Sequence, residues 1–387
     1  MLIKNAYLPG QGARDIRIER GTITAIESTL DGPADLDATN LVAIPGFVDT
    51  HRHMVQSPLR GLAPDMPLAA YFTEIISRMD RYTEEDIHNA ILLGAAEAID
   101  AGVTTVLDWA GTPAALTIET YSQAGIRAVF ANSNTENDQD IRKYAGLTGR
   151  VTTALAPLGP DFMSLEDTKQ RLKLARELGL MSSMHIGGTK PGGVAALHEA
   201  GLLGPDLHFV HGNRLTDDEL RMIADTGSSL TVSTVVESLM GHGETAYNRF
   251  RAAGGTPALG VDVVINNRPD LFTEMQSTLW RERLKTPFPA KDLLKSATQD
   301  GAKAIGLPTT GHLTPGNHAD IVLLNGLEHL LNTPADLAGA IVTSLGTENV
   351  QTVLVDGEIQ KLNGNLVNHS LTELRTKTRA IAAKLLT

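Results

Sequence analysis

Several common features are missing from this 387-residue sequence, and each absence excludes a class of chemistry. There is no cysteine, which excludes disulfides, thiolate-ligated zinc, a cysteine nucleophile and the deaminase motif that pairs His-x-Glu with Pro-Cys-x-x-Cys. No run of about 18 apolar residues occurs, so no membrane-spanning helix is expected. Basic residues are few: 33 lysines and arginines face 45 acidic residues, which argues against binding to a nucleic-acid backbone.

The N-terminal stretch 1–21 also lacks the apolar core of a signal peptide. The rest of the composition is that of an ordinary globular protein, with enough apolar residues for a sizeable core. We therefore expect a cytoplasmic protein.

Both ends of the chain have the alternating, β-branched pattern of short strands. Near the C terminus the strand candidates are separated by Asp-Gly and Asn-Gly, which favour tight hairpin turns. We expect residues 1–45 and 311–367 to form one small β-sandwich domain. Residues 368–387 have helical apolar spacing and predict a C-terminal helix.

Between these ends, eight apolar strand candidates alternate with helical patterns, in which apolar residues recur at i, i+3 and i+4. Eight strand–helix units over residues 46–310 predict an α/β fold of the (β/α)₈ TIM barrel type, although a doubly wound open sheet alternates in the same way. The strand count and the polar residues at the strand ends favour the barrel. The strand candidates are residues 43–51, 102–110, 126–133, 151–159, 180–187, 207–212, 229–234 and 256–262.

Two histidines end the first of these strands. Side chains alternate along a strand, so His51 and His53 project from the same face and can grip one metal ion. Active sites of barrels lie at the C-terminal ends of the strands, where the fifth, sixth and eighth strands supply His185, His211 and Asp262. These nitrogen and oxygen donors suit zinc or another divalent transition metal with an open position for water.

Five sequence blocks carry a more specific signal. In chain order they are PGFVDTHRH, HRHMVQSPLRGLAPDMPL, VHGNRLTDDEL, ALGVDVVINNRPDLFTEM and GHLTPGNHADIVLL. Together they resemble the amidohydrolase superfamily, in the branch of the cytosine and guanine deaminases and the triazine hydrolases. The resemblance extends from about residue 1 to about residue 360.

The resemblance implies that His51, His53, His185 and Asp262 bind the metal. His211 would polarise the substrate or the attacking water, and Asp262 would also act as general base. Binuclear members often use a carboxylated lysine on the fourth strand, whose sequence here, VTTALAP, contains none. We therefore expect one divalent metal ion per chain, with zinc favoured and iron(II) or manganese(II) as alternatives.

One position departs from that branch. Its deaminases have His-x-x-Glu after strand five, and this glutamate carries a proton to the ring and on to the leaving ammonia, whereas here Gly188 takes its place. Lys190, Glu237 and His242 are candidates to replace it. We favour Glu237, which falls just past a predicted strand end. Alternatively, the glycine makes room for a bulkier substrate.

Four further residues are candidates for substrate binding: Gln56, Arg60, Trp109 and His242. Three of them also have a simpler interpretation. Arg60 can pair with a nearby acid, Trp109 can pack at the barrel mouth, and His242 can lie in a solvated loop.

The sequence thus predicts a hydrolase that uses a metal-activated water on a C–N bond of a small nitrogen heterocycle. Hydrolytic deamination is the leading reaction, and ring opening of a cyclic amide or imide, or loss of another leaving group, is the alternative. A catalytically silent relative that only binds a ligand is a third hypothesis, which turnover would separate from the first two. We expect a small-molecule substrate, no nucleic-acid or membrane partner, and a homo-oligomer.

Overall fold

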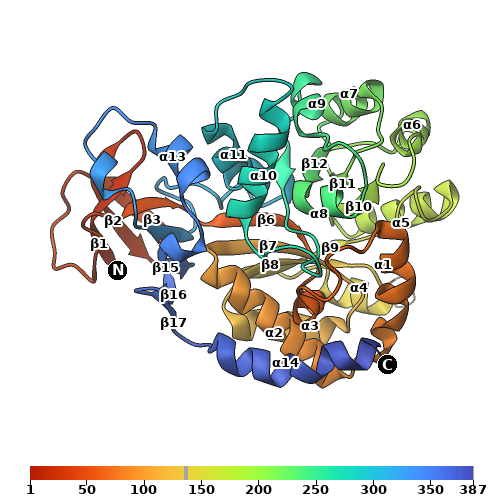
Figure 1. The fold of residues 1–387 in the computed structure, drawn as a ribbon, viewed down its shortest axis with the longest axis horizontal. Coiled ribbons are helices and arrows are strands. Elements are labelled where there is room, and N and C mark those ends of the chain that lie inside the picture. The colour runs from red at the N-terminus through yellow and green to blue at the C-terminus, as the bar shows by residue number, and fades with distance from the viewer. Residues whose placement is uncertain (135–137, 387) are drawn as a thin grey trace.

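The computed structural model describes residues 1–134 and 138–386 and contains two sheets, one parallel and one mainly antiparallel (Figure 1). Eight parallel strands follow one another around the first sheet in chain order, and each strand predicted from the sequence is present. Their bounds are β6 (Phe47–Arg52), β7 (Val103–Ala110), β8 (Arg127–Asn132), β9 (Val151–Leu155), β10 (Ser182–Ile186), β11 (Leu207–His211), β12 (Ser229–Val232) and β13 (Ala258–Leu259).

The first and last strands meet and close this sheet into a barrel. The Thr50 hydroxyl donates to the carbonyl of Leu259 at 2.8 Å, and the amide of Asp262 donates to the carbonyl of His51 at 2.8 Å. Gly260 makes the approach possible, because a Cβ there would lie 2.8 Å from the backbone nitrogen of His51. The barrel prediction is confirmed, and the open-sheet alternative is excluded.

Helices surround the barrel, and several of them begin at a polar cap. Thr83 and Thr216 each form a capping box with an acidic residue three positions on. The helices of this region are α1 (Leu68–Glu74), α2 (Glu84–Asp100), α3 (Ala114–Ala124), α4 (Asp138–Tyr144), α5 (Leu165–Glu177), α6 (Gly193–Glu199), α7 (Asp217–Asp225), α8 (Thr234–Leu239), α9 (Tyr247–Ala252), α10 (Leu271–Arg283), α11 (Lys291–Ser296) and α12 (Gln299–Ala304), with 3-10 helices η1 (Met54–Leu59) and η2 (Ile76–Arg81).

The second sheet combines strands from both ends of the chain, as predicted, and these strands form one continuous hydrogen-bonded path. Its nine strands in the described residues run in the order β17-β16-β15-β14-β5-β1-β2-β3, with β4 beside β1. The reason is that β5 pairs with both β1 and β14, which joins the N-terminal and C-terminal strands edge to edge. The strands are β1 (Leu2–Leu8), β2 (Gly12–Glu19), β3 (Thr22–Glu27), β4 (Leu36–Asp37), β5 (Val42–Pro45), β14 (Ile321–Leu324), β15 (Val350–Val355), β16 (Glu358–Leu362) and β17 (Asn365–Leu366).

One strand predicted as continuous, residues 43–51, is divided between the two sheets. Its first part is β5 and its second part is β6, with Gly46 at the junction. A Cβ at Gly46 would lie 2.1 Å from the Thr104 hydroxyl, so only glycine allows the chain to pass here from one sheet to the other.

Charged groups and the last helix fasten the second sheet to the barrel. Arg127 of β8 pairs with Asp320 at 2.8 Å and with Asp356 of the β15–β16 turn. Helix α14 (Leu371–Leu386) lies along α2 (Figure 1), while α13 (Leu337–Ser344) packs on α11. None of the helices in the described part of the chain has the length and apolar character needed to cross a bilayer.

Candidate active site

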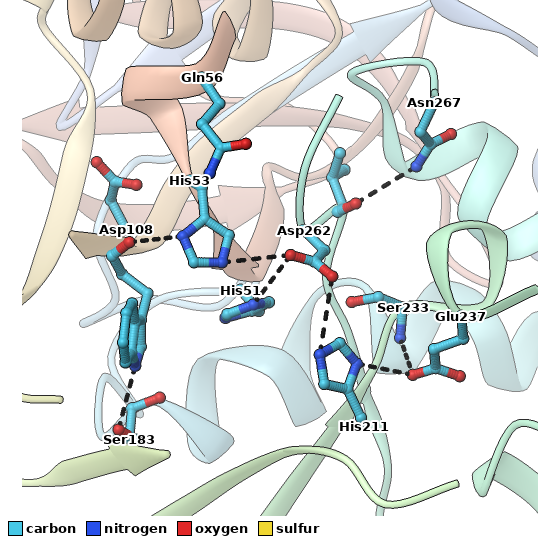
Figure 2. Close-up of polar contacts among 12 residues, drawn as sticks. His51, His53, Gln56, Asp108, Ser183, His211, Ser233, Glu237, Asp262 and Asn267 are labelled. Carbon is cyan, nitrogen blue, oxygen red and sulfur yellow. Dashed lines mark hydrogen bonds and ion pairs between the residues drawn. The ribbon is translucent and has the colours of Figure 1, made fainter. Parts of the chain in front are cut away.

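The carboxylate of Asp262 is the point where the strand-end histidines meet (Figure 2). Its Oδ1 lies 3.3 Å from Nε2 of His51 and 3.3 Å from Nε2 of His53, and its Oδ2 lies 3.8 Å from Nε2 of His211. These contacts join the first, sixth and eighth barrel strands. The residues predicted as strand-end ligands therefore do come together.

His185, at the end of β10, completes the cluster. The centre of its ring lies 4.8 Å from that of His51 and 5.4 Å from that of His211. Two groups of potential ligand atoms result, one formed by His51, His185 and His211 and the other by His51, His53 and Asp262, with the atoms of each group within 4.8 Å of one another. His51 is common to both groups and is fully buried.

Two of these residues have backbone conformations that side-chain-bearing residues rarely adopt. His211 has a φ of 82° and Asp262 a φ of 63°, both in the left-handed region. Such strain persists where the surrounding structure fixes the residue, and it concentrates at functional sites. His211 is the last residue of β11 and Asp262 lies three positions after the end of β13, at the barrel mouth, which favours a functional reason for their geometry.

The electrostatics favour neutral imidazoles at His51 and His185 and an ionised carboxylate at Asp262. Burial lowers the pKa of His51 to about 4 and that of His185 well below its usual value. For Asp262, burial acts to raise the pKa, but the charge and hydrogen bonds of His51 and His53 outweigh it and hold the pKa well below its usual range. Neutral histidines and an ionised aspartate are the protonation states in which these side chains ligate a metal.

The imidazole nitrogens that lack a hydrogen-bond donor or acceptor role in the cluster are suited to bind a metal ion. Within the described residues, Nδ1 of His51 has no hydrogen-bond partner and its Nε2 has only the carboxylate of Asp262, although the side chain is fully buried. His53 presents its free Nε2, because its Nδ1 lies 2.8 Å from the Trp109 carbonyl, an oxygen that can only accept. A donor set of imidazole nitrogens and one carboxylate suits zinc and its neighbours in the transition series.

A second layer of buried polar groups supports the first and last strands. Arg52 points away from the cluster and pairs with Asp49 at 3.1 Å. Asp108 accepts hydrogen bonds from the backbone amide of Met54, at 2.8 Å, and from the Tyr121 hydroxyl. These contacts fix the backbone on either side of His51 and His53, as supporting groups do around metal ligands.

Glu237 occupies a different position from the one expected. It lies behind His211, with Oε1 3.3 Å from Nδ1 of that ring (Figure 2). The same Oε1 accepts from the backbone amide of Ser233 at 2.8 Å, and Oε2 accepts from the Asn213 side chain at 2.9 Å. Glu237 is fully buried and does not line the cavity in front of the cluster. This placement favours orientation of His211 over direct proton transfer to a substrate.

The cluster forms the inner end of a cavity of about 350 Å³. The polar inner end comprises His53, His185, His211, His242 and Asp262. Apolar side chains form most of the outer wall, namely Leu68, Phe72, Ile76, Leu158, Phe162 and Met240. A volume of this size and a mainly apolar wall with a few converging polar groups are typical of small-molecule sites.

Gly188 and His242 face each other across the inner end. A Cβ added to Gly188 would lie 3.7 Å from the ring of His211 and 3.9 Å from Nδ1 of His242. His242 is almost completely buried, and neither ring nitrogen has a hydrogen-bond partner in the residues that the structure describes. Burial, with the charge of His211 next, lowers the pKa of His242 to about 4, so its imidazole is neutral near pH 7.

The other predicted substrate contacts are distributed differently. Trp109 lines the cavity, with its indole N–H 3.3 Å from the Ser183 carbonyl. Gln56 lies behind the wall and donates to the hydroxyl of Tyr71, a lining residue, at 2.6 Å. Arg60 does not line the cavity.

Arg60 pairs with Glu97 of α2 at 2.7 Å, because η1 carries the chain outward from the barrel mouth. It borders a separate hollow of about 620 Å³ that contains none of the clustered histidines. The simpler interpretation of Arg60, an ion pair with a nearby acid, matches this geometry.

One carboxylate at the cavity was missed from the sequence. Asp161 lines the cavity, and its Oδ2 accepts from the Thr189 hydroxyl at 3.1 Å. It lies six positions after the end of β9, so a search limited to residues adjoining the strand ends passes over it. A search extended along each strand-to-helix loop would have included it.

A closed parallel barrel with this cluster at the C-terminal ends of its strands defines a class of metal-dependent hydrolases. The chain belongs to the amidohydrolase family, whose model matches residues 42–360. A 5-methylthioadenosine/S-adenosylhomocysteine deaminase of Pyrococcus furiosus is 30% identical, covering 91% of this chain and 92% of the relative. The predicted family and the predicted class of enzyme, a hydrolase of C–N bonds, are confirmed.

Solved structures share the whole fold. An adenosine deaminase from Xanthomonas campestris with bound zinc superposes with a TM-score of 0.88 at 21% identity, covering 100% of this chain and 98% of the other. An atrazine chlorohydrolase mutant from Arthrobacter aurescens, complexed with zinc and atraton, gives a TM-score of 0.86 at 20% identity, with 98% and 99% covered. At these identities the likeness establishes the fold alone.

Proposed function

We propose that this protein catalyses the hydrolytic deamination of an aminated nitrogen heterocycle. The observation that carries the proposal is the Asp262 carboxylate, held 3.3 Å from both His51 and His53 at the inner end of the cavity. That position combines a proton acceptor with a set of free imidazole nitrogens. The deaminase relative supports the choice of reaction.

We propose His51, His53, His185 and Asp262 as the residues that hold one divalent metal ion, with zinc favoured. A metal ion bound there would supply a water of lowered pKa. Zinc in one structural neighbour supports this choice over iron(II) or manganese(II).

The protein groups then have separate roles. Asp262 takes the proton of the attacking water at Oδ2, and this proton leaves with the amino group as ammonia. His211, 3.8 Å from that oxygen, steadies the charge that develops next to it. Its other nitrogen is held by Glu237, which we propose as a positioning residue.

His242 is the side chain we propose for recognition of the ring. A neutral imidazole offers one N–H donor and one acceptor. A ring nitrogen and the amino group on the neighbouring ring carbon present an acceptor beside a donor, so His242 can pair with either. Trp109, on the same cavity, offers a flat face for the heterocycle.

Adenine nucleosides are the first substrate class to test. The Pyrococcus relative is named for 5-methylthioadenosine and S-adenosylhomocysteine, and it aligns with this chain over nearly its whole length. Ring opening, or loss of a leaving group other than ammonia, is the second candidate. It is favoured by Gly188, which leaves no side-chain acid at that point of the cavity.

Metal content and turnover test the proposal together. Protein purified without chelator should contain about one metal ion per chain by elemental analysis and release ammonia from a panel of aminated purines, pyrimidines, pterins and triazines. The same reactions, followed by absorbance, detect ring opening. His185→Ala should lose metal and activity together, whereas the exposed His198→Ala should lose neither.

Each alternative has its own result. Metal without ammonia but with an absorbance change would favour ring opening. Metal without any turnover would favour a silent ligand-binding relative, and absence of metal after reconstitution would reject the ligand assignment. A cytoplasmic location and a homo-oligomeric state stay predictions, which fractionation and sedimentation would test.

A further inference from the structure

The outer half of the cavity is built by two loops that carry exposed apolar side chains. Phe72 of α1 and Ile76 of η2 come from the first barrel loop, and Leu158 and Phe162 come from the loop after β9. Their exposed fractions are 39%, 38%, 40% and 43%, in that order, which is high for large apolar residues. Such a cluster around a cavity mouth is typical of a surface that binds an apolar group.

The two loops meet across the mouth. The rings of Phe72 and Phe162 are tilted with their centres 5.7 Å apart. Leu68 and Met240 continue the apolar wall inward, toward the histidine cluster. A ligand whose reacting ring lies against the cluster must therefore extend along apolar side chains.

Among the described residues, the side chains that line this cavity include carboxylates but no basic group apart from histidine. Over the described residues, no lysine or arginine lines the cavity, and the sequence outside the description, residues 135–137 and 387, contains neither. Asp161 is the charged group of the outer half. Lys190 and Arg214 are exposed neighbours, and Arg214 donates to the Gly188 carbonyl from outside the lining.

We infer that the substrate carries an uncharged, apolar substituent on its reacting ring, and that substituents with a carboxylate or phosphate are rejected. The inference rests on the proposed function for the reaction itself. An anion placed along Phe72 and Phe162 loses water without gaining a cation, which is costly, and Asp161 adds repulsion.

A matched pair of nucleosides tests this selectivity. 5′-Methylthioadenosine and S-adenosylhomocysteine share ring and sugar, but the second carries an amino-acid group in place of a methyl. We expect kcat/KM to favour the first by about 100-fold, since the carboxylate of the zwitterionic amino-acid group finds no cation in the cavity lining and its burial costs several kcal/mol. Equal values, or a preference for the charged substrate, would overturn the inference.

Variants locate the effect at the wall. Phe162→Lys adds a cation at the mouth and should reduce the preference at least tenfold, mainly by a lower KM for the charged substrate; Leu158→Lys is a second variant at the same mouth. Leu284→Lys, on a residue 89% exposed and outside the cavity, is the matched control and should leave the preference unchanged. If Lys190→Ala abolished use of the charged substrate, an unrecognised cation contact would be established and the inference rejected.

A binding measurement separates this inference from the proposed reaction. The chain has two tryptophans, Trp109 in the cavity and Trp280 on the surface, so Trp280→Phe leaves Trp109 as a fluorescent reporter. We expect 1-naphthylmethanol to quench it with at least tenfold higher affinity than 1-naphthoate. This result without deamination of any panel member would support the apolar wall and reject the reaction. Deamination without this binding preference would support the reaction and reject the inference about the apolar wall.

Discussion

Oε1 of Glu237 lies 3.3 Å from Nδ1 of His211, on the opposite side of the imidazole from Nε2, which lies 3.8 Å from Oδ2 of Asp262. A carboxylate can only accept, so this contact places a proton on Nδ1. Burial acts to lower the pKa of His211, but the hydrogen bond and charge of Glu237 and the charge of Asp262 outweigh it and raise the pKa. Glu237 therefore decides both the orientation and the protonation of the ring that faces Asp262.

Glu237→Gln should impair the chemical step and leave substrate binding nearly intact. The amide oxygen can still accept from Nδ1, but the negative charge that stabilises a protonated His211 is lost, and we expect kcat to fall about 10–100-fold. Steady-state kinetics and metal analysis provide the measurement, with KM and metal content near their original values. Glu244→Gln removes an exposed carboxylate of the same segment, paired with Lys285, and should change nothing. A loss of metal with the loss of rate would contradict a purely positioning role.

His242→Ala should weaken substrate binding more than it slows the chemical step. The variant removes a buried imidazole whose two nitrogens are free for the ring of the substrate. Loss of such hydrogen bonds costs about 1–3 kcal/mol, so KM should rise about 10–100-fold. Added imidazole should restore part of the affinity, because the cavity beside Gly188 is open to it. His198→Ala, on an exposed histidine, is the control; an unchanged KM for His242→Ala would reject the assignment.

Two adjacent glycines should respond differently to alanine. A Cβ at Gly187 would lie 2.7 Å from the Leu215 side chain, at a φ of 62°, whereas a Cβ at Gly188 meets only His211 and His242 at ordinary contact distances. Gly187→Ala should lower stability by about 1–3 kcal/mol. Gly188→Ala should melt at the same temperature as the parent and alter only kinetics, by narrowing the cavity. Thermal unfolding measures both, and equal melting temperatures would show that Leu215 moves aside.

The barrel and most of the cluster are readable from the sequence because both depend on local pattern. Short apolar runs define the strands, and His185 and His211 lie at or beside the ends of those runs. Because the C-terminal ends of barrel strands meet at one face, these residues can be predicted to lie close together without any knowledge of the loops. Even β13, with two residues, was found because its apolar run leads directly to Asp262.

The features that could not be predicted from the sequence depend on the path of the chain after each strand and on long-range strand pairing. Glu237 points behind His211 because α8 begins directly after β12 and its first turn places the carboxylate against the amide of Ser233. Arg60 is carried away from the cavity by η1 and meets Glu97, a partner 37 positions further along the chain. The continuous terminal sheet likewise depends on long-range pairing between β5 and β14.

The junction between the two sheets should be sensitive to charge at Asp356. This carboxylate accepts from His318 at 2.8 Å and pairs with Arg127, which is buried. Partial burial acts to raise the pKa of Asp356, but the hydrogen bond from His318 and the charge of Arg127 outweigh it and hold the pKa well below its usual range. We expect Asp356→Asn to lower the free energy of unfolding at pH 7 by about 1–3 kcal/mol, since it leaves Arg127 with fewer anionic partners.

The pH dependence of this effect follows from the direction of the shift. A carboxyl whose pKa is lowered in the folded state contributes stability that is fully present above its pKa in the unfolded chain, about 3.9, and is lost as the pH falls toward the folded value. The titration of Asp356 itself should thus leave the difference between parent and Asp356→Asn constant from pH 7 to pH 5 and shrink it below about pH 4. Urea unfolding at pH 7, 5 and 3.5 measures it. Glu358→Gln, which removes an exposed partner of Arg150, should cost less than about 1 kcal/mol at every pH, because exposed ion pairs contribute little. An equal loss for both variants would mean that burial of Arg127 does not set the strength of the junction.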